Sequence, residues 1–435
     1  MAVIIYFMIA NRWELCYTLR EVKNMKKTIQ RKYAKLIART GANIQKGQTV
    51  RLYINADQYE FATILVDECY KAGASRVDID WDWQPITKLD YRHRTLKSLS
   101  TVQKWQEERL KLMAEELPCR IIILSDDPDG LKGVNQEKMQ KARIAKYPVI
   151  KPYRDAIENR HQWTIAAIPS YAWAKKVFPD LSKYQAFNKL WDAILASVHV
   201  TEDNDPQEAW RQHNETFKKR CDWLNARKFE RLEYKSSNGT DFTAWLMPES
   251  RWCGGGEYTL SGVYYNPNMP TEEIFTSPCK GKAEGTLVST KPLSYEGQLI
   301  ENFSITFENG KAVSWKAEKG EPLLTKMITM DEGAAMLGEL ALIPCNSPIN
   351  NSGILFYETL FDENASCHVA LGMGFNECVD GFQNLTNDEC KALGVNDSMI
   401  HVDFMVGAPD LSITGYKNGK AVPVFVNGEW ANGVG

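Results

Sequence analysis

Two hydrophobic patterns follow one another along this chain, and their order restricts the fold more than any single motif does. Through residues 26–168, helical periodicity alternates with short strand-like runs such as Thr49–Ile54. After residue 250, alternating runs are separated by the hairpin signals Asn309–Gly310, Asn418–Gly419 and Asn427–Gly428. The first pattern predicts a mainly parallel sheet covered by helices, and the second predicts antiparallel β structure.

A chain of 435 residues exceeds the usual size of a single core, so we expect two domains. We predict an α/β N-terminal domain over residues 25–250, with a helical insertion near residues 180–231. We predict a β-rich α+β C-terminal domain over residues 251–435, built on a curved antiparallel sheet or an open barrel. Residues 1–24 are interpreted as an extension outside the fold, because a basic amphipathic helix pattern begins at Met25.

Several individual elements are also predicted. The charged segment Thr95–Glu116 reads as one long helix. In the second half, Asp331 is expected to cap a helix over Gly333–Leu337, with Glu339 at its end. Three tryptophans fall within amphipathic helical segments and are interpreted as core or interface residues; they are Trp191, Trp210 and Trp223.

Composition excludes several functional classes. The formal net charge of −3 argues against binding to nucleic acid, and the apolar run Ala2–Ala10 is too short to span a bilayer, so no membrane association is expected. The ten cysteines form no C-x-x-C pair, which favours reduced thiols in a cytoplasmic protein. Four of the six histidines lack an acidic or imidazole partner at ligand spacing and are interpreted as surface or packing residues; they are His93, His161, His199 and His213.

The remaining two histidines, His368 and His401, lie beside acidic residues in strand-like segments. Ile400–Val406 alternates, so His401 and Asp403 point to one face, where they can bind a metal or each other.

Further carboxylates lie in similar surroundings. Glu363 precedes the loop that enters the His368 strand, and Glu339 lies among apolar residues, where a carboxylate needs a partner. Glu272 and Glu273 lie in a loop before Ile274. Taken singly, each residue is explained by a solvated charge or a core histidine. Together they predict a metal site, and carboxylates with imidazoles suit Zn²⁺, Co²⁺ or Mn²⁺ better than Ca²⁺.

Four of these segments, in this order, resemble motifs of the M29 metallopeptidases, the aminopeptidase T and aminopeptidase S family. The segments are Pro270–Pro278, Leu337–Glu339, Asp362–His368 and His401–Met405. The resemblance extends from Met25 to the C-terminus. It implies a dimeric exopeptidase with two divalent cations, which removes N-terminal residues from peptides that have a free N-terminus.

The resemblance also implies site residues. The metal ligands would be Glu273, Glu339, Glu363, His368, His401 and Asp403. Glu272 and Asp362, which adjoin ligands in sequence, are candidates for the general base. Phe375 stands where the family usually has a tyrosine near the metals, so a phenol that stabilises a developing oxyanion would be missing.

Two other functions fit the same residues. One is a non-catalytic, metal-stabilised assembly protein, which the Phe375 departure favours. The other is a metal-dependent amidohydrolase that acts on a small non-peptide amide. The chain has no G-x-S-x-G, no G-x-G-x-x-G and no G-x-x-x-x-G-K-[ST] motif, so neither a serine nucleophile nor a phosphate-binding loop is indicated.

Overall fold

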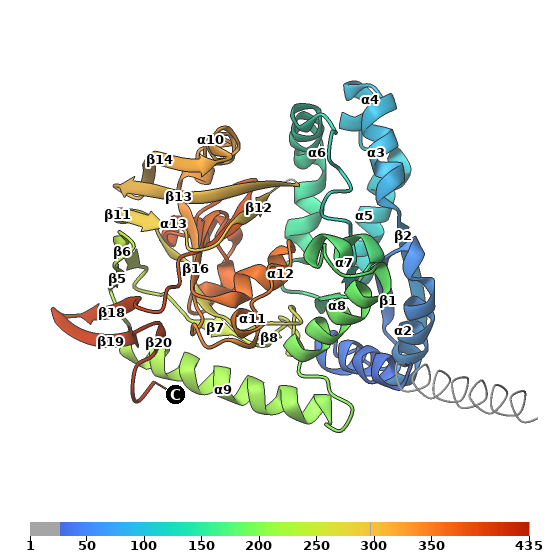
Figure 1. The fold of residues 1–435 in the computed structure, drawn as a ribbon, viewed down its shortest axis with the longest axis horizontal. Helices are drawn as coiled ribbons and strands as arrows, with labels where there is room; N and C mark the ends of the chain where they lie inside the picture. Colours follow the sequence, from blue (N-terminus) through green and yellow to red (C-terminus); the bar gives the residue numbers. More distant parts are fainter. Residues whose placement is uncertain (1–26, 296, 435) are drawn as a thin grey trace, which may run out of the picture.

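The computed structural model describes residues 27–295 and 297–434. Two regions lie side by side in Figure 1: helices around a parallel sheet, and antiparallel sheets with short helices. This arrangement confirms the predicted combination of an α/β domain with a β-rich α+β domain. Within the described residues no sheet closes into a barrel. The predicted extension, residues 1–24, lies outside the described residues.

A four-stranded parallel sheet in the order β2-β1-β3-β4 forms the centre of the first region. Its strands are β1 (Thr49–Asn55), β2 (Arg76–Asp82), β3 (Cys119–Leu124) and β4 (Trp163–Ala167). Burial alternates along β1 and β3, because successive side chains point to opposite faces of the sheet. The sequence pattern predicts all four strands.

Helices pack around this sheet. They are residues 27–36, η1 (Ile37–Gly41), η2 (Ala56–Gln58), α2 (Tyr59–Ala72), α3 (Gln84–His93), α4 (Leu96–Ser100), α5 (Lys104–Glu116), α6 (Gln136–Ile157) and α7 (Tyr171–Val177). The single helix predicted over Thr95–Glu116 is wrong, because Thr101 is extended, with φ −92° and ψ 121°, and Gln103 starts α5 with a capping box. The sequence pattern does not predict α6, which contains two prolines.

The helical segment predicted near residues 180–231 forms α8 (Lys183–Ser197) and α9 (Pro206–Arg227). Trp191 and Trp210 are buried in the core of the first region, as predicted. The long helix α9 runs along the base of the molecule in Figure 1 and extends beneath both regions. Its later residues, including Phe217 and Leu224, join the core of the antiparallel sheets.

A nine-stranded sheet forms much of the second region, in the order β12-β13-β11-β6-β5-β18-β19-β20, with β14 paired to β13. Its strands are β5 (Arg231–Lys235), β6 (Asp241–Leu246), β11 (Pro278–Val288), β12 (Leu293–Tyr295), β13 (Gln298–Glu308), β14 (Lys311–Lys319), β18 (Ser412–Lys417), β19 (Lys420–Val426) and β20 (Glu429–Trp430). Each predicted Asn-Gly pair links two of these strands, and all six residues have positive φ, as tight hairpin turns require.

The sheet pairing bears on the domain boundary expected near residue 250. β5 pairs with β18, and β6 pairs with β11, so residues 231–246 belong to the sheet of the second region. We propose that the boundary lies between α9 and β5.

A smaller antiparallel sheet carries most of the candidate ligands. Its strands, in the order β17-β16-β15-β10-β7, are β7 (Cys253–Gly254), β10 (Ile274–Thr276), β15 (Leu337–Leu342), β16 (His368–Gly372) and β17 (His401–Met405). A separate hairpin pairs β8 (Glu257–Tyr258) with β9 (Tyr264–Tyr265). Every residue of β15 and β16 is buried, which makes this sheet the interior of the second region.

The helices of the second half are short. They are α10 (Glu321–Ile328), η3 (Gly333–Ala335), α11 (Pro348–Asn351), α12 (Thr359–Asp362), η4 (Glu363–Ala365), η5 (Asn376–Cys378), η6 (Phe382–Asn384) and α13 (Asn387–Leu393). The helix predicted over Gly333–Leu337 is wrong beyond its first turn. Asp331 does accept a hydrogen bond from the Ala334 N–H, but the chain then enters β15, where pairing with β16 replaces helical hydrogen bonds. Glu339 therefore lies within a strand.

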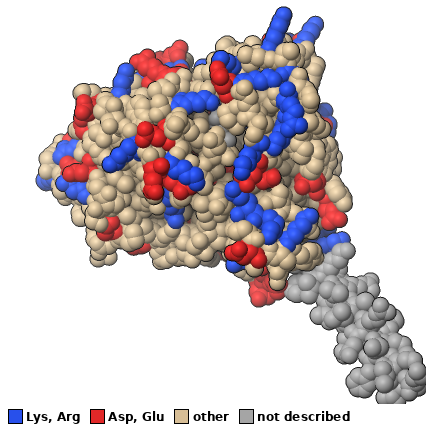
Figure 2. Space-filling model, turned by 45° about the horizontal axis from the view of Figure 1, so that its top comes forward, with Lys and Arg blue, Asp and Glu red and all other residues tan. Residues whose placement is uncertain are grey.

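Acidic and basic side chains are interspersed over much of the face that Figure 2 shows, in line with the small net charge. In the described part of the chain, no helix is both long and apolar enough to cross a bilayer.

Candidate metal centre

Strand register brings four of the six predicted ligands to one face of the small sheet. Ala370 of β16 pairs with Glu339 of β15 on one side and with Asp403 of β17 on the other. Residues directly opposite one another in antiparallel strands share a face, so both carboxylates flank the small Ala370 side chain. His368, two residues before Ala370, points to the same face.

His401 reaches the same face by the same rule. It is paired with Gly372, two residues after Ala370 on β16. The small residues Ala370 and Gly372 therefore leave open the space into which the carboxylates and imidazoles project.

The other two predicted ligands approach from loops. Glu273 immediately precedes β10, and Glu363 begins η4, five residues before His368. The loop that carries Glu273 is fixed to the first region, because the Ile165 N–H of β4 donates to Pro267 O at 2.7 Å and the Met269 N–H donates to Ile165 O at 2.9 Å. The site thus lies where the two regions meet.

Distances within the site are short. His401 Nε2 lies 3.0 Å from Glu339 Oε2 and 3.3 Å from Asp403 Oδ1. His368 Nε2 lies 3.3 Å from Glu273 Oε2 and 3.8 Å from Asp403 Oδ1. All six predicted ligands line one cavity of about 420 Å³.

Both imidazoles are oriented for metal binding. His368 Nδ1 lies 2.9 Å from Glu363 O, and His401 Nδ1 lies 2.7 Å from Met373 O. An Nδ1–H that donates to a backbone carbonyl fixes the tautomer in which Nε2 carries the lone pair. In both residues, Nε2 is the nitrogen that faces the carboxylates.

The buried carboxylates of the site attract positive charge. Burial raises the pKa of Glu339 to about 7, and His401 opposes this shift. Burial and then the charge of Asp403 raise the pKa of Glu363 well above its usual range. In the described part of the chain, no lysine or arginine forms an ion pair with either carboxylate, and Asp403 Oδ1 is buried without a hydrogen-bond partner. Divalent cations would satisfy these oxygens, so the residues fit a metal centre.

Phe375 lies at this cavity, where the resemblance expects a tyrosine. Its ring centroid is 4.8 Å from that of His401 and 5.5 Å from that of Phe275. The phenyl ring therefore presents an apolar edge beside a candidate ligand.

The two candidate bases do not line the cavity. Asp362 accepts hydrogen bonds from the Phe356 and Glu358 N–H groups, and Glu272 faces His199 and His213. Glu358 does line the cavity, although no motif in the sequence marks it. Burial and then the charge of Asp362 raise its pKa to about 7.

Two further carboxyl groups, Glu257 and Glu377, also line the cavity, and they were not selected from the sequence. Glu257 begins the short strand β8 and Glu377 lies in η5, and neither segment carries a recognisable motif. Burial raises the pKa of each; the charge of Glu273 raises the pKa of Glu257 further, and the charge of Glu257 raises the pKa of Glu377 further.

The interpretation of His199 and His213 as residues without an acidic or imidazole partner is wrong. Glu272 lies between their imidazoles, and their ring centroids are 4.8 Å apart. The two histidines are at least 59 residues away from Glu272 in the chain, so sequence spacing carries no signal of this contact.

A cavity between two sheets, lined by oriented imidazoles and buried carboxylates, is the kind of site that metal-dependent hydrolases use. The sequence assigns this site to a family. Residues 26–430 match the thermophilic metalloproteases, M29, and the chain belongs to that family.

Individual relatives are similar to this chain over nearly its whole length. Aminopeptidase AmpS of Bacillus subtilis (strain 168) is 39% identical, over 92% of this chain and 97% of that protein. Aminopeptidase T of Thermus thermophilus is 35% identical, with the same coverage. The solved structure of wild-type AmpT from Thermus thermophilus has a TM-score of 0.85 at 34% identity, over 93% of this chain and 99% of that one. The predicted family resemblance and fold class are confirmed.

Proposed function

We propose that this protein is a metal-dependent aminopeptidase whose cavity holds two divalent cations. The curated relatives are named aminopeptidases, and the family is one of metalloproteases. One observation supports two cations in particular: the ligand atoms form two groups that share Glu339. The first group is Glu273, Glu339 and His368, and the second is Glu339, His401 and Asp403.

In this proposal Glu339, which belongs to both groups, would contribute to both positions, and Glu363 would complete the set beside Asp403. Carboxylates together with neutral imidazoles suit Zn²⁺, Co²⁺ or Mn²⁺. Bound there, the cations would supply a water of lowered pKa and polarise the carbonyl of the scissile bond.

The chain's own residues supply the proton transfer. Glu358 lines the cavity, its pKa lies near neutrality, and it is not one of the predicted ligands. A general base works best when its pKa is close to the operating pH. We therefore assign this role to Glu358 in place of Glu272 and Asp362, which do not line the cavity.

Recognition of a free amino terminus is assigned to Glu257 and Glu377. A buried carboxyl group whose pKa is raised by a neighbouring carboxylate is stabilised in the charged form by a cation, and the substrate ammonium is such a cation. The Tyr265 hydroxyl donates to Glu257 Oε2 at 3.0 Å and holds that carboxylate in place. Acetylation of the substrate amine would remove this interaction.

Hydrolysis of aminoacyl p-nitroanilides tests the proposal. The protein is dialysed against a chelator and then assayed with Zn²⁺, Co²⁺ or Mn²⁺, on free and N-acetylated substrates. We expect metal-dependent hydrolysis of the free amines alone. Full metal content without hydrolysis would favour the non-catalytic assembly protein, and hydrolysis of acetylated amides would favour the amidohydrolase.

A matched pair of variants tests the ligand set. His401→Ala is expected to lower the metal content and abolish hydrolysis, while His93→Ala, at an exposed position, is expected to change neither. Unchanged metal content in His401→Ala would contradict the assignment.

A homodimer and a cytoplasmic location complete the proposal. The dimer rests on the family resemblance. The location is supported by the cysteines, all unpaired in the described part of the chain, as expected for a reducing compartment.

A further inference from the structure

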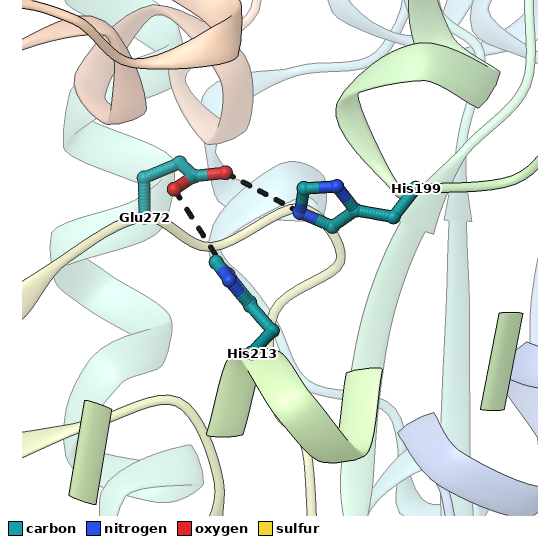
Figure 3. Close-up of side chains that lie close together, drawn as sticks. All are labelled: His199, His213 and Glu272. Carbon is teal, nitrogen blue, oxygen red and sulfur yellow. Dashed lines mark ion pairs between the residues drawn. The ribbon is translucent and has the colours of Figure 1, made fainter. Parts of the chain in front are cut away.

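A second cluster of side chains that can bind a metal ion lies outside the proposed metal centre. His199, His213 and Glu272 point toward one another across a small space (Figure 3). His199 Nε2 lies 3.6 Å from Glu272 Oε1, and His213 Nε2 lies 3.9 Å from Glu272 Oε2. The three residues come from the turn after α8, from α9 and from the loop before β10, so three separate segments meet at this point.

These separations are too long for hydrogen bonds. His213 Nε2 lies 2.9 Å from Thr271 O, but two other atoms of the cluster have no partner. His199 Nε2 and Glu272 Oε1 are both buried without a hydrogen-bond partner. The Glu272 side chain is only 11% exposed. Arg220 of α9 stacks on Trp430 instead, at 5.0 Å, and within the described residues both ion pairs of Glu272 are with these histidines.

A buried carboxylate oxygen and a buried imidazole nitrogen that face each other without a bond are costly unless a third group lies between them. Two ligands of one tetrahedral zinc ion, each about 2.0–2.1 Å from the metal, lie roughly 3.4 Å apart. The observed separations of 3.6 and 3.9 Å are close to this value.

The surrounding structure holds each ligand in place. The His199 N–H donates to Ala196 O at 3.2 Å, and Asn204 Nδ2 donates to His199 O at 2.6 Å. The His213 ring lies against Phe217, with centroids 4.4 Å apart. The Glu272 N–H donates to Asn364 Oδ1 at 2.6 Å. Such fixed positions reduce the ordering cost of binding an ion.

We propose that His199, His213 and Glu272 form an additional divalent-cation site, separate from the catalytic centre and suited to Zn²⁺. Two imidazoles and one carboxylate are a zinc-type donor set. Thr271 O, 2.9 Å from His213 Nε2, is available as a fourth ligand once the imidazole carries its proton on Nδ1.

The position of this site defines its role. Glu272 and Glu273 are consecutive, and their side chains face different clusters: Glu272 the two histidines, and Glu273 the catalytic cavity. A cation bound to Glu272 would fasten the loop that positions Glu273 to α8 and α9 of the first region. The additional site is therefore structural, because it holds a catalytic ligand in place without contacting the substrate.

Metal stoichiometry tests this proposal. Wild-type protein, His199→Ala and Glu272→Gln are equilibrated at defined free Zn²⁺, and bound zinc is measured by elemental analysis. We expect each variant to bind one ion fewer per chain than the wild type. Glu272→Gln keeps the side-chain size, so it serves if His199→Ala fails to fold, and circular dichroism verifies the fold. His93→Ala is the matched control and is expected to bind as many ions as the wild type.

Crystals soaked in Zn²⁺ supply the second measurement. An anomalous peak bonded to His199 Nε2 and Glu272, at about 2.0–2.2 Å, would support the site. Equal zinc content in the wild type and both variants, or crystals that show no peak there, would overturn it.

This result is independent of the proposed activity. Absence of peptidase activity with one ion lost in His199→Ala would reject the proposed function and retain the additional site. Full peptidase activity with no ion lost in His199→Ala would support the proposed function and reject the additional site.

Discussion

Replacing Glu358 by glutamine tests the assignment of the general base. The amide keeps the size and shape of the side chain but cannot accept the proton from water at neutral pH. Glu358 is not a predicted ligand, so metal content should not change. We expect kcat to fall, with little change in KM, because the lost interaction acts in the transition state.

The magnitude follows from the role and from the surroundings of the side chain. A positioned general base contributes about 10²–10⁴-fold in rate, or roughly 3–5 kcal/mol of barrier. The pKa of about 7, raised by burial and then by Asp362, leaves about half of the groups deprotonated at pH 7. Below that pH, the rate of the wild-type enzyme should fall about tenfold per unit. Bound cations favour the charged carboxylate, so they would move this fall in rate to lower pH.

The assay is steady-state hydrolysis of an aminoacyl p-nitroanilide between pH 5 and 9, with metal content measured on the same samples. In Glu358→Gln, most of the rate should be lost, and the remaining kcat should no longer fall with decreasing pH as it does when Glu358 is protonated. Glu332→Gln, at a position where the side chain is 80% exposed, is the matched control and should behave as wild type. A kcat within about twofold of wild type, at full metal content, would refute the assignment.

Three further outcomes are expected. Phe375→Tyr should raise kcat by roughly tenfold in steady-state assays, because a phenol beside His401 can donate to a developing oxyanion; an unchanged kcat at full metal content would contradict this. Ala370→Val should reduce bound metal in elemental analysis, because the added methyl groups enter the space between Glu339 and Asp403; wild-type stoichiometry in a folded variant would count against the proposed centre. Burial lowers the pKa of His161 from 6.5 to about 4, so the unfolded chain binds more protons between those values, and stability is lost as pH falls through them. Between pH 7.5 and 5, the free energy of unfolding from urea titrations should fall by about 2 kcal/mol more in wild type than in His161→Gln; equal losses would show that His161 is not responsible.

Local patterns in the sequence were sufficient for much of the fold. Alternation predicts β1, and short apolar runs predict β3 and β4. The Asn-Gly pairs predict hairpins because they tolerate the positive φ that tight turns need. The same alternation places His401 and Asp403 on one face. These inferences depend only on residues that are neighbours in the chain.

Errors arose where a distant segment competes with a local preference. The helix expected after Asp331 gives way to β15, because its backbone pairs with β16, about thirty residues further along the chain. The helix α6 was missed because its two prolines obscure an otherwise helical segment. In both cases tertiary packing outweighs local propensity.

The sequence by itself determined the family, the alternation of elements and the residue types that can bind metals, because all of these are encoded in short, ordered motifs. Only the tertiary structure decided which of those residues meet. Strand register brings Glu339 and Asp403 to either side of Ala370, and chain folding brings Glu358 to the cavity and Glu272 between His199 and His213. A ligand set is a relation between side chains in space, and nothing in the spacing along the chain specifies contacts between segments that only the packed fold brings together.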